Sequence, residues 1–119
     1  MPTVPDTRTA GIFFALGDET RLSVLRKLGR APALSATVLA EKAPVSRQAI
    51  VKHLQVLMAA GLVRPQRQGR EVLYALESAR LDEARAFLHT VSADWDQALD
   101  RLRKSVEAPP PRRRRQKST

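Results

Sequence analysis

The chain of 119 residues has no cysteine. A disulfide framework, a thiolate nucleophile and a thiolate metal site are therefore excluded. The sequence also has no apolar run near the roughly 20 residues that a membrane-spanning helix needs. The apolar patch at residues 11–16 is too short for the core of a secretory signal. These absences predict a cytoplasmic protein with no membrane partner.

Side chains of the kinds that bind metals or act in catalysis are also few. His53 and His89 are the only histidines, and they fall on different predicted elements. A zinc site needs about four nitrogen, oxygen or sulfur ligands within reach of one another. No Ser-His-Asp set, pair of catalytic carboxylates or glycine-rich phosphate loop is present. The sequence therefore predicts no metal site, no cofactor and no enzymatic activity.

Acidic residues are missing from one long stretch. Between Lys42 and Arg70 the chain carries six Lys or Arg side chains and no Asp or Glu, within a protein of net charge +9. Residues 108–119 add five basic side chains and three prolines, again without an acid. Basic charge concentrated on one segment is typical of nucleic-acid binders. A solvated basic face has the same composition and is the alternative interpretation.

The pattern of the first third of the chain predicts two helices. A loose arm at residues 1–7 precedes a helix at about residues 8–16. Asp18 is placed to cap a second helix. The core face of that helix is predicted to carry Leu22, Leu25 and Leu28.

Two further helices are predicted in close succession. Ser35 can cap a helix of about residues 35–43, which Pro44 breaks. Ser46 then caps a fourth helix that ends at Gly61. Helices joined by so short a turn cross at a steep angle, which is the helix-turn-helix arrangement. The inward side chains of the third helix are predicted to be Val38 and Leu39.

The fourth helix has a polar face opposite its apolar stripe, at about 100° per residue. In the major groove Arg favours guanine, Gln favours adenine and Val can pack on a thymine methyl, while Ser, Thr and Lys suit phosphate. An ordinary solvated helix face is the alternative. The predicted DNA contacts of this helix-turn-helix are Thr37, Ser46, Arg47, Gln48, Val51 and Lys52.

After the fourth helix, "LVRPQ" and "EVLYAL" predict a two-stranded hairpin with Gly69 at a position that needs positive φ. Pro65 cannot donate to a strand ladder, so its strand is predicted either to lie at an edge or to be interrupted there. Such a projection is a wing. Arg67 and Arg70 beside its tip are predicted to reach a minor groove or flanking phosphates, unless they serve only solubility.

The last predicted element is a long helix at about residues 79–106. Its apolar residues recur at a spacing of 3–4, which is typical of helices that pack along a seam. A domain this small cannot easily cover such a stripe itself, so a second copy is predicted to supply the partner helix. The predicted interface residues on this helix are Leu88, Val91, Trp95, Leu99 and Leu102.

Three segments, "GDETR", "KHLQVLMAAGLV" and "GREVLYAL", occur within this order of helices and wing. Together they resemble the ArsR-type winged-helix repressors over roughly residues 11–106. The resemblance implies a homodimeric repressor with the first and last helices at the interface, which adds Ile12 and Phe13. Many members have Ser or Thr where Val51 stands. Metal sensors of the family carry cysteine in the third helix, where this chain has "LSATVLAEKA", so it resembles a branch without metal sites.

The predicted fold is mainly α with a small two-stranded β-wing: a winged helix-turn-helix domain at residues 8–107, followed by a disordered basic tail at 108–119. The predicted function is a homodimeric, sequence-specific repressor that binds a pseudo-palindromic operator in double-stranded DNA of the bacterial nucleoid. The alternatives are a repressor switched by an organic ligand or a metal, a non-specific architectural DNA binder, and a helical protein-interaction module. Any small-molecule effector is left unspecified.

Overall fold

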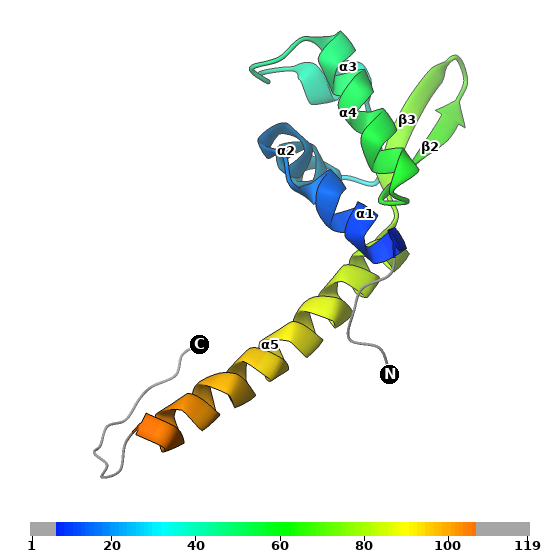
Figure 1. Cartoon of the computed structure of the whole chain (residues 1–119). Helices are drawn as coiled ribbons and strands as arrows, with labels where there is room; N and C mark the ends of the chain where they lie inside the picture. The colour runs from blue at the N-terminus through cyan, green and yellow to red at the C-terminus, as the bar shows by residue number, and fades with distance from the viewer. Residues whose placement is uncertain (1–6, 107–119) are drawn as a thin grey trace. The chain divides into compact units, whose positions relative to one another are not determined.

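The computed structural model describes residues 7–106, which belong to two compact units. One unit ends at Phe87 and the other begins at Leu88. Thr7, expected in the arm, begins the first helix. The remainder of that arm and the predicted tail at residues 108–119 lie outside the described residues. The elements (Figure 1) are α1 (Thr7–Leu16), α2 (Glu19–Leu28), β1 (Leu34–Ser35), α3 (Ala36–Ala40), α4 (Arg47–Ala59), β2 (Val63–Gln68), β3 (Glu71–Leu76) and α5 (Ser78–Val106).

Three helices begin at the predicted capping residues. The side-chain oxygens of Asp18, Ser35 and Ser46 each accept a backbone N–H three residues further on, at 3.0, 3.1 and 3.1 Å. Each such cap stabilises a helix by about 1 kcal/mol, because it satisfies a backbone donor that has no partner within the helix. The starts of α2, α3 and α4 are therefore set by local sequence.

The turn between α3 and α4 is longer than predicted, because α3 ends at Ala40 rather than at residue 43. Within this turn Lys42 has a φ of +62°, the only positive φ of a non-glycine residue among residues 7–106. This left-handed conformation costs roughly 1–2 kcal/mol for a residue with a Cβ. The helices on either side of this turn, α3 and α4, pack against each other.

Gly61 ends α4 as predicted, with a φ of +77°. A Cβ added there would lie 2.9 Å from Cγ of Arg80 in the first turn of α5. Glycine is therefore required both by the backbone conformation and by the close approach of a side chain.

The wing is the hairpin of β2 and β3, and Gly69 opens its two-residue turn with a φ of +64°. Its strands belong to a three-stranded antiparallel sheet in the order β1-β3-β2, so the prediction of two strands was incomplete. β1 has only two residues, too few for an alternating pattern to reveal it. Pro65 lies on β2, at the edge of the sheet, and the pairing with β3 continues through it, which is the first of the two predicted outcomes.

In the unit that ends at Phe87, the helices α1, α2, α3 and α4 all contribute side chains to the hydrophobic core. Two predicted core residues are instead partly exposed: Leu22 at 46% and Val38 at 44%. Val24 takes the inward position on α2, and Leu39 that on α3. The largest fully buried side chains are Ile12, Val24, Leu28, Leu39, Ile50, Leu54, Leu57 and Leu62.

Candidate nucleic-acid interface

The helix-turn-helix consists of α3, the turn at residues 41–46 and α4. α4 packs against α3 and β2, so the wing follows directly beside it (Figure 1). Ile50, Leu54 and Leu57 hold the inner face of α4 in the core. This anchoring leaves the opposite face of α4 at the surface.

The predicted groove-facing residues of α4 do share one surface. Arg47, Gln48 and Lys52 are exposed, and Val51 is half-buried between them and the core. A shallow, open depression of about 520 Å³ is lined by Ser46, Arg47, Gln48, Ala49, Val51, Lys52 and Gln55. None of these side chains is acidic. The surface can therefore offer donors to phosphate and to base edges without a neighbouring carboxylate on the same face.

Two of the predicted contact residues bind each other. Nε of Arg47 donates to Oγ1 of Thr37 at 3.1 Å, which joins the starts of α4 and α3. Ser46 has a second role in the same place, since its Oγ accepts the N–H of Ala49 as the cap of α4. Its hydroxyl hydrogen remains able to donate to a phosphate oxygen.

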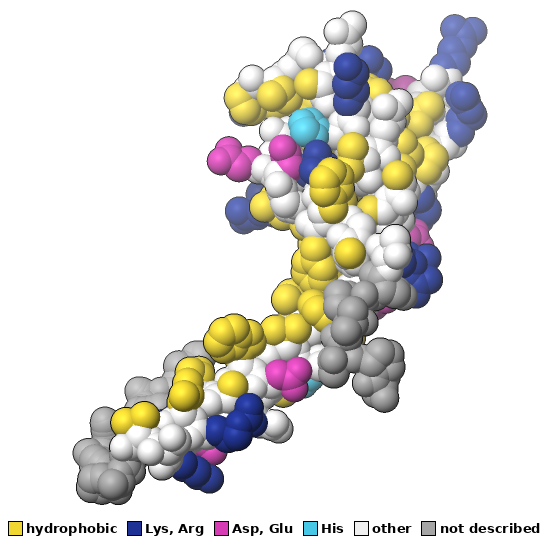
Figure 2. Space-filling view, viewed as in Figure 1, with side chains coloured by type: hydrophobic (Ala, Val, Ile, Leu, Met, Phe, Trp, Pro, Cys, Tyr) yellow, Lys and Arg dark blue, Asp and Glu magenta, His cyan; other side chains and the backbone are white. Residues whose placement is uncertain are grey.

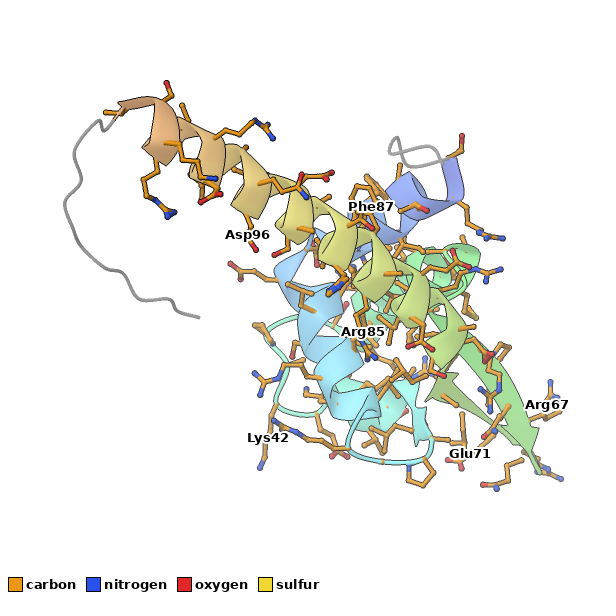
Figure 3. The ribbon with its side chains drawn as sticks, turned by 90° about the horizontal axis from the view of Figure 1, so that it is seen from below. Lys42, Arg67, Glu71, Arg85, Phe87 and Asp96 are labelled. Carbon is orange, nitrogen blue, oxygen red and sulfur yellow. The ribbon has the colours of Figure 1, made fainter. Side chains whose placement is uncertain are left out.

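The wing carries arginines of two kinds. Nη1 of Arg64, near the base, lies 2.7 Å from Glu77 and also donates to the Leu76 carbonyl, so this side chain is engaged within the chain. Arg67 and Arg70 are exposed and form no ion pair among residues 7–106. Figure 3 shows Arg67 on the hairpin that extends from the helices. The two arginines near the turn are the ones available to a ligand.

A polar cluster behind α4 was not predicted from the sequence. Arg21 donates through Nε to the Ala15 carbonyl at 2.6 Å and through Nη2 to the Phe14 carbonyl at 3.3 Å, at the end of α1. Its Nη1 lies 3.2 Å from Nδ1 of His53 on α4. Because a guanidinium only donates, Nδ1 of this ring is the acceptor. Arg21 thus links the end of α1 to the middle of α4.

Asp18 lies at the edge of the same cluster, with Oδ2 at 3.8 Å from Nδ1 of His53. The backbone N–H of Arg21 donates to this carboxylate and is the largest cause of the lowered pKa of Asp18, which burial partly opposes. Hydrogen bonding to the charged form is the expected cause of such a shift.

On α1 the structure corrects one predicted interface residue. Ile12 has 0% exposure and lies in the core of its own chain, so its side chain has no surface left for a partner. Phe13 is half-buried and packs on Phe87, with ring centroids 5.7 Å apart. Phe14 is 72% exposed and is the aromatic side chain of α1 that faces solvent. Helical periodicity alone could not choose among three consecutive apolar residues.

The unit that begins at Leu88 exposes nearly all of its large apolar side chains. Trp95 is 63% exposed, while Val91 is half-buried. Figure 2 shows hydrophobic side chains gathered along one side of this helix. The exposed members are Leu88, Trp95, Leu99, Leu102 and Val106.

Residues 7–106 contain no group of three or more His, Asp or Glu side chains placed to hold a metal ion, and the chain has no cysteine. Within the same range no helix combines the length and apolar character needed to cross a bilayer.

A helix-turn-helix followed by a wing defines the class of winged helix-turn-helix DNA-binding proteins. A family model described as a helix-turn-helix domain matches residues 16–66. The probable mercury resistance operon repressor of Streptomyces lividans is 35% identical to this chain over 98 residues, which are 82% of this chain and 77% of that protein.

Similar solved structures indicate the family within this class. An ArsR-like transcriptional regulator from a Rhodococcus species has 43% identity and a TM-score of 0.73, over 86% of this chain and 95% of that one. A homodimeric winged helix-turn-helix DNA-binding domain from Mycobacterium bovis, a possible ArsR-family regulator, has 25% identity and a TM-score of 0.59, over 86% and 88%. The chain belongs to the ArsR family of transcriptional regulators. These relatives are regulators rather than enzymes, which confirms both the resemblance and the prediction of a non-enzymatic protein.

Proposed function

We propose that the protein is a homodimeric, sequence-specific repressor that binds a pseudo-palindromic operator in the cytoplasm, at the nucleoid. The observation that carries this proposal is the acid-free, exposed face of α4 beside an arginine-bearing wing. One α4 from each protomer enters the major groove, and the two half-sites lie about one helical turn apart. Occupation of the operator excludes the polymerase.

On α4 the residues divide by what they reach. Arg47 and Gln48 read base edges, with Arg suited to guanine and Gln to adenine. Val51 packs against a thymine methyl, since it offers no hydrogen bond. Ser46 and Lys52 bind phosphate and set the position of the helix along the duplex.

On the wing, Arg67 and Arg70 bind the adjacent minor groove or the phosphates that flank it. Support comes from their exposure and from their lack of ion pairs within residues 7–106. The DNA-binding domain spans residues 8–107, and the basic residues of 108–119 add affinity through phosphate contacts that carry no sequence preference.

Dimerisation uses α5 together with α1. The exposed row of Leu88, Trp95, Leu99 and Leu102 would otherwise face water, and exposed apolar patches of this kind mark interaction sites. Val91 completes the row, and α1 contributes Phe13 together with Phe14. The homodimeric relative from M. bovis supports a second copy as the partner.

The proposal is tested by selection from a randomised double-stranded DNA library with the purified full chain. We expect a shared inverted repeat, bound with one dimer per site, and weaker binding to a shuffled duplex of equal length. A library that returns no shared sequence, with equal affinity for all duplexes, would favour the architectural alternative. A single half-site bound by one monomer would overturn the dimeric mechanism.

A further inference from the structure

One hydrogen bond between two side chains lies on the exposed surface of the candidate interface. Nε of Arg47, the first residue of α4, donates to Oγ1 of Thr37 in the first turn of α3. Both side chains are exposed. The bond is therefore not part of the core, and a stabilising role within the hydrophobic interior does not account for it.

This hydrogen bond leaves the two terminal nitrogens of Arg47, Nη1 and Nη2, without a hydrogen-bond or ion-pair partner among residues 7–106. A guanine presents O6 and N7 side by side in the major groove, and arginine reads them with two parallel hydrogen bonds. Because Nε is already engaged, the approach that remains is end-on, through the two terminal nitrogens.

The hydrogen bond also reduces the side-chain entropy that Arg47 would lose on binding DNA. Arginine has many rotamers, and fixing them at an interface opposes binding. A hydroxyl that holds Nε before DNA arrives removes part of that loss. It also keeps the guanidinium plane from turning toward a phosphate, where it would carry no sequence information.

We infer that Thr37 is a positioning residue that aims Arg47 at one guanine of each half-site. This assignment rests on the proposed function and deepens it, because it gives Thr37 a role in sequence choice rather than only in phosphate binding. The side chain acts through its hydroxyl oxygen as an acceptor, so serine can replace it and valine cannot.

The test uses the duplex selected by the wild-type full chain, together with variants in which one half-site carries a single substituted base pair. Thr37→Val is the nearly isosteric loss of the hydroxyl, and Thr37→Ser is its rescue. We expect Thr37→Val to lose roughly threefold to tenfold of the discrimination at one base pair per half-site, the range for immobilising one rotamer-rich side chain. Discrimination at the other positions and the salt slope should stay as in the wild type.

A double-mutant cycle identifies the side chain through which Thr37 acts. In an Arg47→Ala background, Thr37→Val should have no further effect at that base pair. Arg47→Lys keeps the charge but lacks Nε in a fork, so it should also lose the discrimination while retaining the salt slope. Thermal unfolding of each variant checks that the domain remains folded.

The assignment is overturned if Thr37→Val weakens the selected and shuffled duplexes equally and additively with Arg47→Ala, because that result describes an independent phosphate contact. It is also overturned if valine and serine both behave as threonine. A selection without a shared sequence would instead overturn the proposed function and this assignment together.

Discussion

The two units of the chain treat their apolar side chains in opposite ways. Up to Phe87, large residues such as Leu54 and Leu57 are fully buried within a single copy. From Leu88 onward, residues of the same kind lie exposed along one helix. The first unit therefore carries its own core, whereas the second leaves its apolar side chains at the surface. In the proposed dimer, substitutions in the first unit should affect folding, and substitutions in the exposed row of the second should affect assembly.

The largest expected effect comes from charging the exposed row. Val91→Glu combined with Trp95→Glu should give a monomer at micromolar concentration, because two carboxylates would have to be desolvated in the seam. Operator affinity should fall by roughly 10²–10⁴-fold, the gain that linking two binding modules provides. Sedimentation and binding to the selected duplex measure the two effects.

Ala93→Glu with Gln97→Glu is the matched control for that variant. It adds two carboxylates at the same spacing on the opposite face of α5, at about 100° per residue. This control should remain dimeric and bind normally. If the wild type sediments as a monomer, or if both pairs of substitutions dissociate it equally, the row is not the seam.

The next prediction compares the free energy of unfolding after one apolar side chain is truncated in each unit. Leu54→Ala should lower the free energy of unfolding by about 2–5 kcal/mol at every protein concentration, since it leaves a cavity in the core. Leu99→Ala should lower stability only where the protein is dimeric, because binding of a second copy adds to apparent stability. Urea unfolding over a range of concentrations compares them. Equal losses in dilute solution would mean that Leu99 is buried in the monomer.

A smaller effect distinguishes sequence recognition from bulk charge. Gln48→Ala should cost about 1–3 kcal/mol on the selected operator, with little change on random DNA or in salt slope. Deleting residues 108–119 should weaken both duplexes alike and flatten the salt slope, since it removes basic charge. Binding of both variants to both duplexes at two salt concentrations decides the matter. The reverse pattern would remove the groove assignment of α4.

The smallest effect concerns pH. Asp18 has a lowered pKa in the folded protein, so its charge contributes stability above the unfolded-state pKa, and this contribution disappears as pH falls through the folded value. Asp18→Asn keeps the capping oxygen but not the charge. The wild type should therefore be the more stable of the two at neutral pH, and the difference should shrink below about pH 4. A difference that grows on acidification would contradict the assignment.

Local signals in the sequence correctly predicted the starts of three helices, the glycine that follows α4 and the glycine in the wing turn. The three caps, the end of α4 at Gly61 and the wing turn at Gly69 each depend on a residue and its near neighbours. The position of Pro65 at an edge follows from its missing N–H. Such features are readable because the energy that determines them lies within a few residues of the chain.

Contacts between distant residues were the ones missed. In the five-residue α3, Leu39 faces inward as predicted, but one turn of pattern could not show that Val38 faces outward. The bond of Arg21 to His53 and that of Arg47 to Thr37 join different elements, and no periodicity encodes them. The groove face of α4 could be grouped from sequence because all of its members share one long helix.

The sheet edges have a consequence for behaviour in concentrated solution. On one side of β3 the edge strand β1 has only two residues, and on the other β2 carries Pro65 and exposed arginines. Short edge strands, proline and charge each discourage the addition of a strand from another molecule. The addition of a strand from another molecule to this sheet is therefore disfavoured, which agrees with the proposal that the protein dimerises through its helices.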